Sequence, residues 1–410
     1  MTVLWPRKPF KLVMQKRFAG EWGGEEGTSE LDIPCIRVAD FNRLQNVVTD
    51  RVPTVRSVNL KTAQAKHLQP HDILIEKSGG GDKTPVGTPI LYLGSEKAIC
   101  SNFIEVVRLQ PGHDPRFWTY TLISSYEMGN TRRFINQTTG IQNIDSQRFY
   151  DQVFPVPPLK TQQRIADYLD RETAEIDAVV ADLDRYVELL EKRRLEMIRC
   201  KTQFDERGTE WRRCATQLVF RSIGSGTTPK KDLGYYTPSG SENGIPWITT
   251  SELREEVVHE TRMQVSRKAL EELASLQIHP AGSVAIAMYG ATIGRLGILG
   301  IPSTTNQACC VFSRPEGIDP KFFFYSLWAD RDILIRHSSG GGQPNISQGL
   351  MQRWKTPLPP LSTQHKIVKT LDRETTEIDS LIADSTSLRD LLLKRRSVLI
   401  SEVVTGRKQV

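Results

Sequence analysis

Two stretches of the chain repeat each other and decide the fold: PVPPLKTQQRIADYLDRETAEIDAVV at residues 155–180 and PLPPLSTQHKIVKTLDRETTEIDSLI at residues 357–382. The offset is 202 residues (357 − 155), and the copies align without a gap from Pro155 to Ile198 and from Pro357 to Ile400. Roughly half of the aligned residues are identical, which chance does not give over this length. The chain is therefore an internal duplication.

Each repeated stretch is expected to be one long helix. In the first copy, apolar residues recur mostly three, four or seven positions apart, as in the seam of a coiled coil. Pro and Gly are absent between Thr161 and Arg207 and between Thr363 and Val404. The Pro-Pro pairs just upstream mark where each helix begins. Each helix should run for roughly 40 residues, or about 60 Å.

The two helices are natural partners for each other, because a lone amphipathic helix of this length would expose its seam to water. We predict that they pack as an antiparallel coiled coil with a pseudo-twofold relation between the repeats. The alternative is that each helix packs separately on its own domain. The runs Lys192-Arg193-Arg194 and Lys394-Arg395-Arg396 fit a solvated helix face or a contact to a partner protein, and a contact to DNA phosphate is the alternative.

The segments between the helices correspond only loosely. Residues 114–120 resemble residues 319–325, with aromatic runs after an Asp-Pro start that predict buried helices; base stacking is the alternative for these rings. Short β-branched runs such as residues 72–75 and 283–288 predict strands. The fold class is therefore α+β: two mixed α/β domains at 1–154 and 205–356, separated by long helices at 155–204 and 357–410, the last with a C-terminal tail.

The composition is that of a globular protein with several domains, at 410 residues and 38% hydrophobic residues. No apolar stretch has the length of a membrane span or a signal peptide, so a cytoplasmic protein is expected. The net charge of +6 is compatible with a nucleic-acid partner. The cysteines form no CxxC pair, so we expect small buried hydrophobes rather than metal ligands. They are Cys35, Cys100, Cys200, Cys214, Cys309 and Cys310.

Polar, glycine-rich and basic loops recur at matching places in both repeats. Arg and Lys suit phosphate or guanine edges, Asn and Gln suit adenine edges, and glycine lets a backbone approach a phosphate. Each loop alone could be a plain turn, but their recurrence favours DNA binding. The candidate DNA-binding residues are Lys77, Ser78, Lys83, Arg132, Arg133, Asn136, Gln137, Thr138, Thr139, Gln142 and Asn143 in the first domain, and Thr227, Thr228, Lys230, Lys231, Tyr289, Thr292, Arg295, Ser338, Ser339, Gln343 and Asn345 in the second.

The whole pattern resembles the specificity subunits of type I restriction-modification systems. The resemblance is carried by the paired Pro-Pro-Leu-x-x-Gln starts, the Leu-Asp-Arg-Glu-Thr-x-Glu-Ile-Asp blocks, the Lys-Arg-Arg runs and the upstream Gly-x-x-x-Asn-Ile elements. It implies that each variable domain is a target recognition domain for one half of a split DNA site. It also implies that the helices set the gap between the half-sites.

The resemblance further implies two adenine methyltransferase subunits as partners, docked on the helices, for which Leu169, Ile176, Leu371 and Ile378 are the candidate residues. S-adenosylmethionine would be bound by the methyltransferase, and ATP and Mg by a restriction subunit that can join. This chain would carry no cofactor, metal or catalytic residue. The sequence contains neither a phosphate-binding Walker loop nor an Asn/Asp-Pro-Pro-aromatic methyltransferase element. The alternatives are a free-standing DNA-modifying enzyme, a coiled-coil scaffold without DNA specificity, and the recognition protein of a related defence system.

Overall fold

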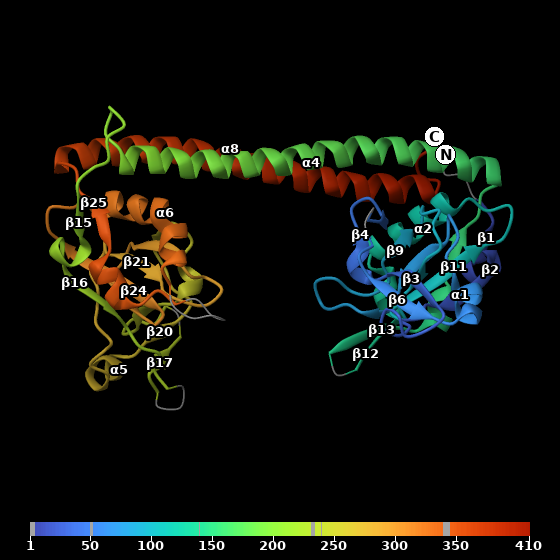
Figure 1. Cartoon of the computed structure of the whole chain (residues 1–410), viewed down its shortest axis with the longest axis horizontal. Coiled ribbons are helices and arrows are strands. Elements are labelled where there is room, and N and C mark those ends of the chain that lie inside the picture. Colours follow the sequence, from blue (N-terminus) through green and yellow to red (C-terminus); the bar gives the residue numbers. More distant parts are fainter. Residues whose placement is uncertain (1–4, 50–51, 139, 231–233, 239, 339–344) are drawn as a thin grey trace. The chain divides into compact units, whose positions relative to one another are not determined.

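The computed structural model describes residues 5–49, 52–138, 140–230, 234–238, 240–338 and 345–410. They form two compact units: unit 1 is Met1–Arg185 with Ser385–Val410, and unit 2 is Tyr186–Asp384 (Figure 1). The two predicted long helices are confirmed as α4 (Leu159–Gln203) and α8 (Leu361–Val404). Each unit contains part of both helices and one mixed α/β domain, so the predicted fold class is also confirmed.

Unit 1 is built on a six-stranded sheet of order β2-β11-β7-β9-β5-β4. Its inner strands are continuous apolar runs, and Ile73, Leu74 and Ile75 of β7 are 0 to 1% exposed because both faces are covered. The large sheet consists of β2 (Met14–Ala19), β11 (Ile104–Leu109), β7 (Ile73–Glu76), β9 (Pro89–Leu91), β5 (Val47–Val48) and β4 (Phe41–Asn42).

Three smaller sheets complete unit 1, with orders β10-β3-β6, β12-β13-β8 and β1-β14. Their strands are β10 (Ile99–Cys100), β3 (Leu31–Ile36), β6 (Val55–Val58), β12 (Ile135–Thr138), β13 (Ile141–Ile144), β8 (Ser78–Gly79), β1 (Arg7–Pro9) and β14 (Val153–Pro155). The helices are α1 (Leu60–Lys66), α2 (Pro115–Glu127) and α3 (Ser146–Tyr150), with 3₁₀ turns η1 (Phe10–Val13), η2 (Val38–Asp40) and η3 (Asn130–Phe134).

Unit 2 follows the same plan with a five-stranded sheet of order β16-β24-β21-β22-β19, a four-stranded sheet β17-β20-β18-β23 and a pair β15-β25. The strands are β16 (Phe220–Ser225), β24 (Cys309–Pro315), β21 (Val284–Ala287), β22 (Leu296–Leu299), β19 (Glu256–Val258), β17 (Tyr236–Thr237), β20 (Gln264–Val265), β18 (Ile245–Ile248), β23 (Thr304–Thr305), β15 (Arg213–Ala215) and β25 (Lys355–Pro357). The helices are α5 (Arg267–Glu272), α6 (Pro320–Arg336) and α7 (Gln348–Arg353), with 3₁₀ turns η4 (Thr216–Leu218) and η6 (Thr250–Glu252).

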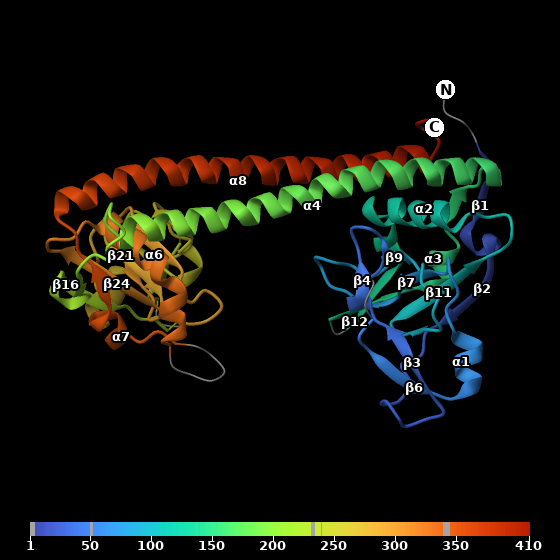
Figure 2. The same ribbon diagram turned by 45° about the horizontal axis from the view of Figure 1, so that its top comes forward.

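In each unit the aromatic helix after the Asp-Pro start lies against the long helices (Figure 2). The core of unit 1 joins Trp118 of α2 to Leu169 of α4 and Ile400 of α8. The core of unit 2 joins Phe323 of α6 to Leu371 of α8. Trp118 and Phe323 are fully buried, so the prediction of core packing for the aromatic runs is confirmed.

The most similar repeated residues hold that aromatic helix in place. In unit 1 the side chain of Gln162 accepts a hydrogen bond from the backbone N–H of Asp114 at 3.0 Å, and Tyr120 donates its hydroxyl to Asp170 at 2.8 Å. The same two contacts recur in unit 2, from Asp319 to Gln364 at 2.7 Å and from Tyr325 to Asp372 at 2.8 Å. The repeated Pro-Pro-Leu-x-x-Gln and Leu-Asp-Arg-Glu-Thr motifs therefore dock a domain onto a helix.

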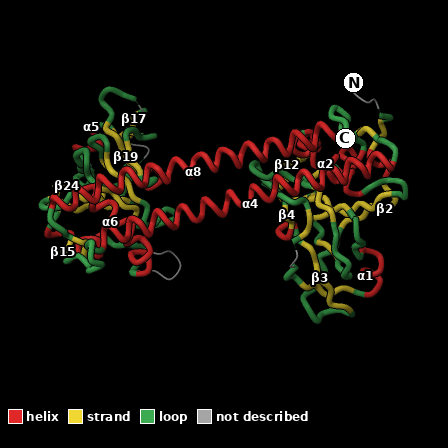
Figure 3. Tube along the Cα trace, turned by 90° about the horizontal axis from the view of Figure 1, so that it is seen from above, coloured by secondary structure: helices red, strands yellow, loops and turns green. Residues whose placement is uncertain are grey.

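Within unit 1 the two long helices lie side by side (Figure 3), and the sequence colours in Figure 2 show that they run antiparallel. Asp177 forms an ion pair with Arg396 at 2.8 Å, and Asp184 forms one with Arg389 at 3.2 Å. The residue number therefore rises along α4 as the number of its partner falls along α8, and the two numbers of each pair sum to 573.

The two helices are also antiparallel in unit 2. Arg194 bonds Asp379 (194 + 379 = 573), and Lys201 lies 3.6 Å from Glu374. The antiparallel prediction is confirmed, and in each unit the segments of both helices also pack on the domain of that unit.

In each Lys-Arg-Arg run the first two residues face solvent, whereas the third contacts the other long helix. Lys192, Arg193, Lys394 and Arg395 are exposed, as a solvated face requires. The third residue of each run behaves differently: Arg396 is 4% exposed on Asp177, and Arg194 bonds Asp379 and lies 5.1 Å from the ring centre of Trp328. These two arginines bind the Asp of the opposite copy's Glu-Ile-Asp block.

The cysteine prediction is correct for Cys35, Cys100, Cys309 and Cys310, which are buried, but wrong for Cys200, which is exposed on α4; Cys214 is half-buried. Burial raises the pKa of the Cys310 thiol to about 12. Across the described ranges, no three His, Cys, Asp or Glu side chains are grouped so as to hold a metal ion. Nor does any helix in those ranges have the length and apolarity needed to cross a bilayer.

Candidate DNA interface

Two loop segments of unit 1 that are far apart in sequence meet in one small sheet. β13 pairs with β8, so that Asn143 lies opposite Ser78 and Gln142 opposite Gly79. The backbone N–H of Ile144 donates to the carbonyl of Lys77 at 2.8 Å. The candidate residues 77–83 and 132–143 therefore form a single surface. β12 and β13 form a hairpin that projects from unit 1 on the side opposite to α4 in Figure 1.

Most candidate side chains on this surface are accessible. Arg132, Asn136, Gln137, Asn143 and Lys83 are exposed, and Lys77 and Ser78 are half-buried. Ser78 donates its hydroxyl to the side-chain oxygen of Asn143 at 2.5 Å, so this bond does not use the N–H₂ group of the exposed Asn143 amide. This geometry suits an adenine edge, which presents both a donor and an acceptor. Thr139 lies outside the described residues, as does the side chain of Thr138.

One candidate of unit 1 needs correction. Gln142 is only 6% exposed and accepts a hydrogen bond from the backbone N–H of Val86 at 3.3 Å, so it supports the loop and cannot touch a base. That loop also requires Gly80, which has φ +54° and whose added Cβ would lie 2.8 Å from the Val86 nitrogen. Arg133 is exposed and lines a hollow beside α2, so its candidacy stays a prediction.

Unit 2 brings its candidate loops together in the same way. Tyr289 and Asn345 form an isolated β-bridge, and the backbone N–H of Ile346 donates to the carbonyl of Met288 at 2.7 Å. Arg295 and Asn345 are exposed, whereas Tyr289 packs partly against the core. Thr292 is half-buried.

Ser338 terminates α6, because its hydroxyl donates to the carbonyl of Ile335 at 2.6 Å. This contact gives Ser338 a structural role beside any contact to DNA. The candidates Lys231, Ser339 and Gln343 lie outside the described residues.

The loop with Thr227, Thr228 and Lys230 reaches the same edge of the unit 2 sheet. β16 ends at Ser225, which lies opposite Cys310 near the start of β24, and Cys310 lies opposite Ile286 near the end of β21. The loops after β16 and β21 therefore leave from one edge. Thr228 and Lys230 are exposed, and Thr228 donates its hydroxyl to the side chain of Gln307. All three sequence-predicted loops of unit 2 thus gather at one end of the sheet.

The equivalent loop of unit 1 was missed from the sequence. It follows β2, and its Trp22 is 38% exposed, with the guanidinium of Arg56 4.5 Å from the ring centre. Arg56 also donates to the Trp22 carbonyl at 3.0 Å. An exposed aromatic ring with an arginine over it suits a base or a sugar-phosphate edge. The missed signal is the equivalence of β2 and β16, which the sequence similarity between the domains is too weak to reveal.

An acidic residue beneath the unit 1 surface is neutralised inside the domain. Glu76 ends β7 at 2% exposure and bonds Arg43 at 2.7 Å. Burial raises the pKa of Glu76, while Arg43 opposes this rise. Its charge is therefore paired within the domain, and the same carboxylate also accepts a hydrogen bond from the loop backbone at Gly80.

The predicted partner-docking residues are wrong as direct contacts. Leu169 and Leu371 are fully buried and Ile176 and Ile378 are 8% and 6% exposed. Leu169 and Ile176 belong to the core of unit 1, and Leu371 belongs to the core of unit 2. The apolar side chains that the helices do expose lie elsewhere on their surfaces. They are Leu159, Val179, Leu388, Leu391 and Val398 in unit 1 and Tyr186, Leu189, Leu195, Leu361 and Leu381 in unit 2.

Comparison with known proteins bears on this arrangement. The family model for the "Type I restriction modification DNA specificity domain" matches residues 22–180 and again residues 219–384. The specificity subunit of the Escherichia coli type I restriction enzyme EcoR124I/EcoR124II is 23% identical over 278 residues, which is 65% of this chain and 63% of that subunit. This chain therefore matches somewhat less than two thirds of that relative.

Two solved structures share the fold. One, described as the "structural basis underlying complex assembly and conformational transition of the type I R-M system", has a TM-score of 0.67 at 15% identity. The other, the HsdS subunit from Thermoanaerobacter tengcongensis, has a TM-score of 0.52 at 15% identity. Each match covers 98% of this chain and 97% of the other.

Proposed function

The chain belongs to the type I restriction-modification DNA specificity family, and from this premise we propose that it reads a double-stranded DNA site in two halves, one in each unit. The observation that carries the proposal is the repeated loop cluster. Both units gather loops at the equivalent end of a sheet, around the pairings Ser78–Asn143 and Tyr289–Asn345. Asn143 and Asn345 are the same residue type, whereas Ser78 and Tyr289 differ, and differing side chains are expected of two readers with different target sequences.

Each loop cluster contains side chains suited to DNA affinity and others suited to discrimination between bases. Exposed cations such as Arg132 and Arg295 neutralise phosphates, which adds affinity without sequence information. Exposed amides such as Asn136 and Asn143 pair with base edges, and a good bidentate pair discriminates by about 1–3 kcal/mol. Joining two such readers makes the second contact intramolecular and so raises the overall affinity.

We assign the gap between the half-sites to the antiparallel helices, which would also dock two adenine methyltransferase subunits. The exposed apolar side chains of α4 and α8, such as Leu189 and Leu391, are the surface offered for docking. S-adenosylmethionine then belongs to the methyltransferase, and ATP and Mg to a restriction subunit. This chain supplies recognition, so its activity is read out on the partner's methylation pattern.

The proposal is tested by sequencing the methylome of a host that carries this chain with its cognate methyltransferase. The expected result is one split motif, methylated on adenine in both halves. Methylation at a continuous motif, or methylation that does not depend on this chain, would contradict the proposal.

A paired deletion tests the role of the helices separately. Removing residues 183–189 from α4 and 384–390 from α8 preserves the antiparallel register, because both 183 + 390 and 189 + 384 equal 573. Seven residues per helix shorten the separation by about 10 Å, or about three base pairs. The half-sites should stay the same while the gap shortens; altered half-sites would refute the assignment of reading to the loops.

A further inference from the structure

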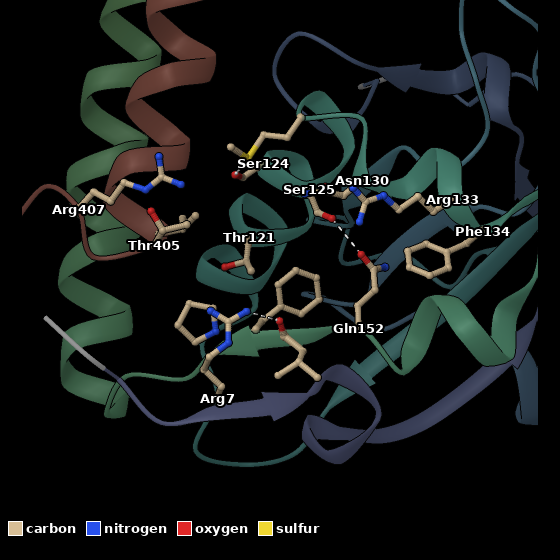
Figure 4. A pocket seen from close by; sticks show the side chains of 15 residues that line it. Arg7, Thr121, Ser124, Ser125, Asn130, Arg133, Phe134, Gln152, Thr405 and Arg407 are labelled. Carbon is tan, nitrogen blue, oxygen red and sulfur yellow. Dashed lines mark hydrogen bonds between the residues drawn. The ribbon is translucent and has the colours of Figure 1, made fainter. Parts of the chain in front are cut away.

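A hollow of about 510 Å³ in unit 1 lies at the position where unit 2 buries a carboxylate, that of Asp330. It lies where β1, β14 and α2 meet the C-terminal end of α8 (Figure 4). The guanidinium groups of Arg7, Arg133 and Arg407 reach it from three sides. Of the described residues that line it, none is acidic.

The equivalent position in unit 2 is filled by a carboxylate from the chain itself. Asp330 of α6 is 3% exposed and accepts hydrogen bonds from Arg213 at 2.7 Å, Trp354 Nε1 at 3.1 Å and Gln203 Nε2 at 3.3 Å. Arg213 is held in place through its Nε, which donates to the carbonyl of Lys355 at 3.1 Å. The single buried carboxylate of Asp330 thus accepts hydrogen bonds from all three of these side chains, which we call the Asp330 cluster.

Unit 1 keeps the arginine of this cluster but has lost the carboxylate. Arg7 occupies the place of Arg213 on the equivalent strand pair and donates to the carbonyl of Val153 at 2.9 Å. The residue that aligns with Asp330 is Ser125, whose hydroxyl donates to Gln152 at 3.0 Å.

The other two members of the cluster have changed as well: Gln152 stands where unit 2 has Trp354, and Thr405 stands where it has Gln203. Smaller and uncharged side chains therefore open the hollow. Within the described ranges, Arg7, Arg133 and Arg407 form no ion pair with a carboxylate.

We propose that this hollow binds a ligand carrying two or more carboxylates, one of which takes the place that Asp330 holds in the other repeat. Charge-assisted bonds from guanidinium groups to carboxylates are the strong class of hydrogen bond, and several cations favour a ligand with several charges. The ligand is either a free di- or tricarboxylate or a run of acidic side chains on another protein. This inference does not depend on DNA reading.

Isothermal titration of the full chain with citrate and with a hexaglutamate peptide tests the proposal. Wild type should bind at least one of the two saturably; tighter binding of citrate assigns a free ligand, and tighter binding of hexaglutamate assigns an acidic protein segment. Ser125→Asp restores the internal carboxylate and should weaken binding at least tenfold. Ser380→Asp adds the same charge at an exposed position on α8 and should leave binding unchanged.

Arg407→Gln provides a second variant at an exposed position, should Ser125→Asp fail to fold. It should weaken binding of the same probe at least tenfold as well. The proposal is overturned if neither probe binds saturably. It is equally overturned if Ser380→Asp weakens binding as much as the variants of the hollow, since the binding would then reflect only the overall positive charge.

Discussion

Replacing Arg396 by Met should destabilise unit 1 selectively. Arg396 donates from Nε to Asp177 at 2.8 Å and from Nη2 to the carbonyl of Leu44 at 2.7 Å, so it ties α8 both to α4 and to the domain. Its side chain is 5% exposed and that of Asp177 is 11% exposed. Burial raises the pKa of Asp177, and the charge and hydrogen bonds of Arg396 oppose that rise.

The size of the effect follows from that burial. Removing one partner of a buried ion pair leaves an uncompensated charge and costs about 3–5 kcal/mol. The matched control is Arg389→Met, because the Arg389–Asp184 pair has the same direction and a similar distance but side chains that are 35% and 52% exposed. An exposed pair contributes about 0–1 kcal/mol. The double variant Asp177→Asn with Arg396→Met should recover part of the loss, since no unpaired charge then remains.

Native-state hydrogen exchange separates the two units. The amides of α2 report on unit 1 and those of α6 report on unit 2. In Arg396→Met, exchange in α2 should accelerate roughly 100- to 5,000-fold, the equivalent of about 3–5 kcal/mol, while α6 stays unchanged. Equal effects of Arg396→Met and Arg389→Met on α2 would refute the reasoning, because burial would then not distinguish the pairs.

Three further predictions concern DNA reading, domain docking and pH. Asn143→Ala should relax discrimination between bases at one position of one half-site by about 1–3 kcal/mol. Arg295→Gln should weaken binding to all DNA sequences and lower the slope of log binding constant against log salt concentration by about one. Fluorescence anisotropy titrations at several salt concentrations measure both effects, and an altered sequence preference in Arg295→Gln would contradict its assignment to phosphate. Gln364→Ala should destabilise unit 2 by about 2–4 kcal/mol in urea unfolding, because it leaves the buried N–H of Asp319 and two carbonyls unpaired; a loss below about 1 kcal/mol would show that water replaces the amide. Burial lowers the pKa of His279 below its ordinary 6.5, so the unfolded chain binds the proton more readily than the folded chain, and the stability present above that pH is lost on acidification. The urea midpoint should therefore fall as the pH is lowered from about 7.5 to about 5.5, and the fall should be smaller in His279→Gln.

The duplication could be read from the sequence because its helical blocks carry the contacts that both units need. Gln162 and Gln364 each accept a hydrogen bond from the backbone N–H at the start of the aromatic helix, and Asp177 and Asp379 each form an ion pair with an arginine of the opposite copy. These contacts demand particular residue types at fixed helical spacing. The periodicity and the identities therefore predicted the helices, their antiparallel direction and the two mixed domains.

The candidate interface was predicted only in part, because residue type does not reveal which way a side chain points. Gln142 and Asn143 are adjacent amides in one strand, yet Gln142 is buried on Val86 and Asn143 is exposed, since neighbouring residues of a strand face opposite sides. Similarly, Leu169 has the apolar character of a docking residue, but the fold covers it completely.

The amino-acid sequence alone determined the repeat, the helices and the kinds of loop that lie between strands, because local periodicity and motif spacing carry that information. Only the tertiary structure decided that residues 77–83 and 132–143 share one surface, that Trp22 joins the loops at the sheet end, and that Arg7 lacks the carboxylate that Arg213 has. Such features depend on strand pairing and packing between residues distant in the chain, and these long-range contacts leave no local pattern in the sequence.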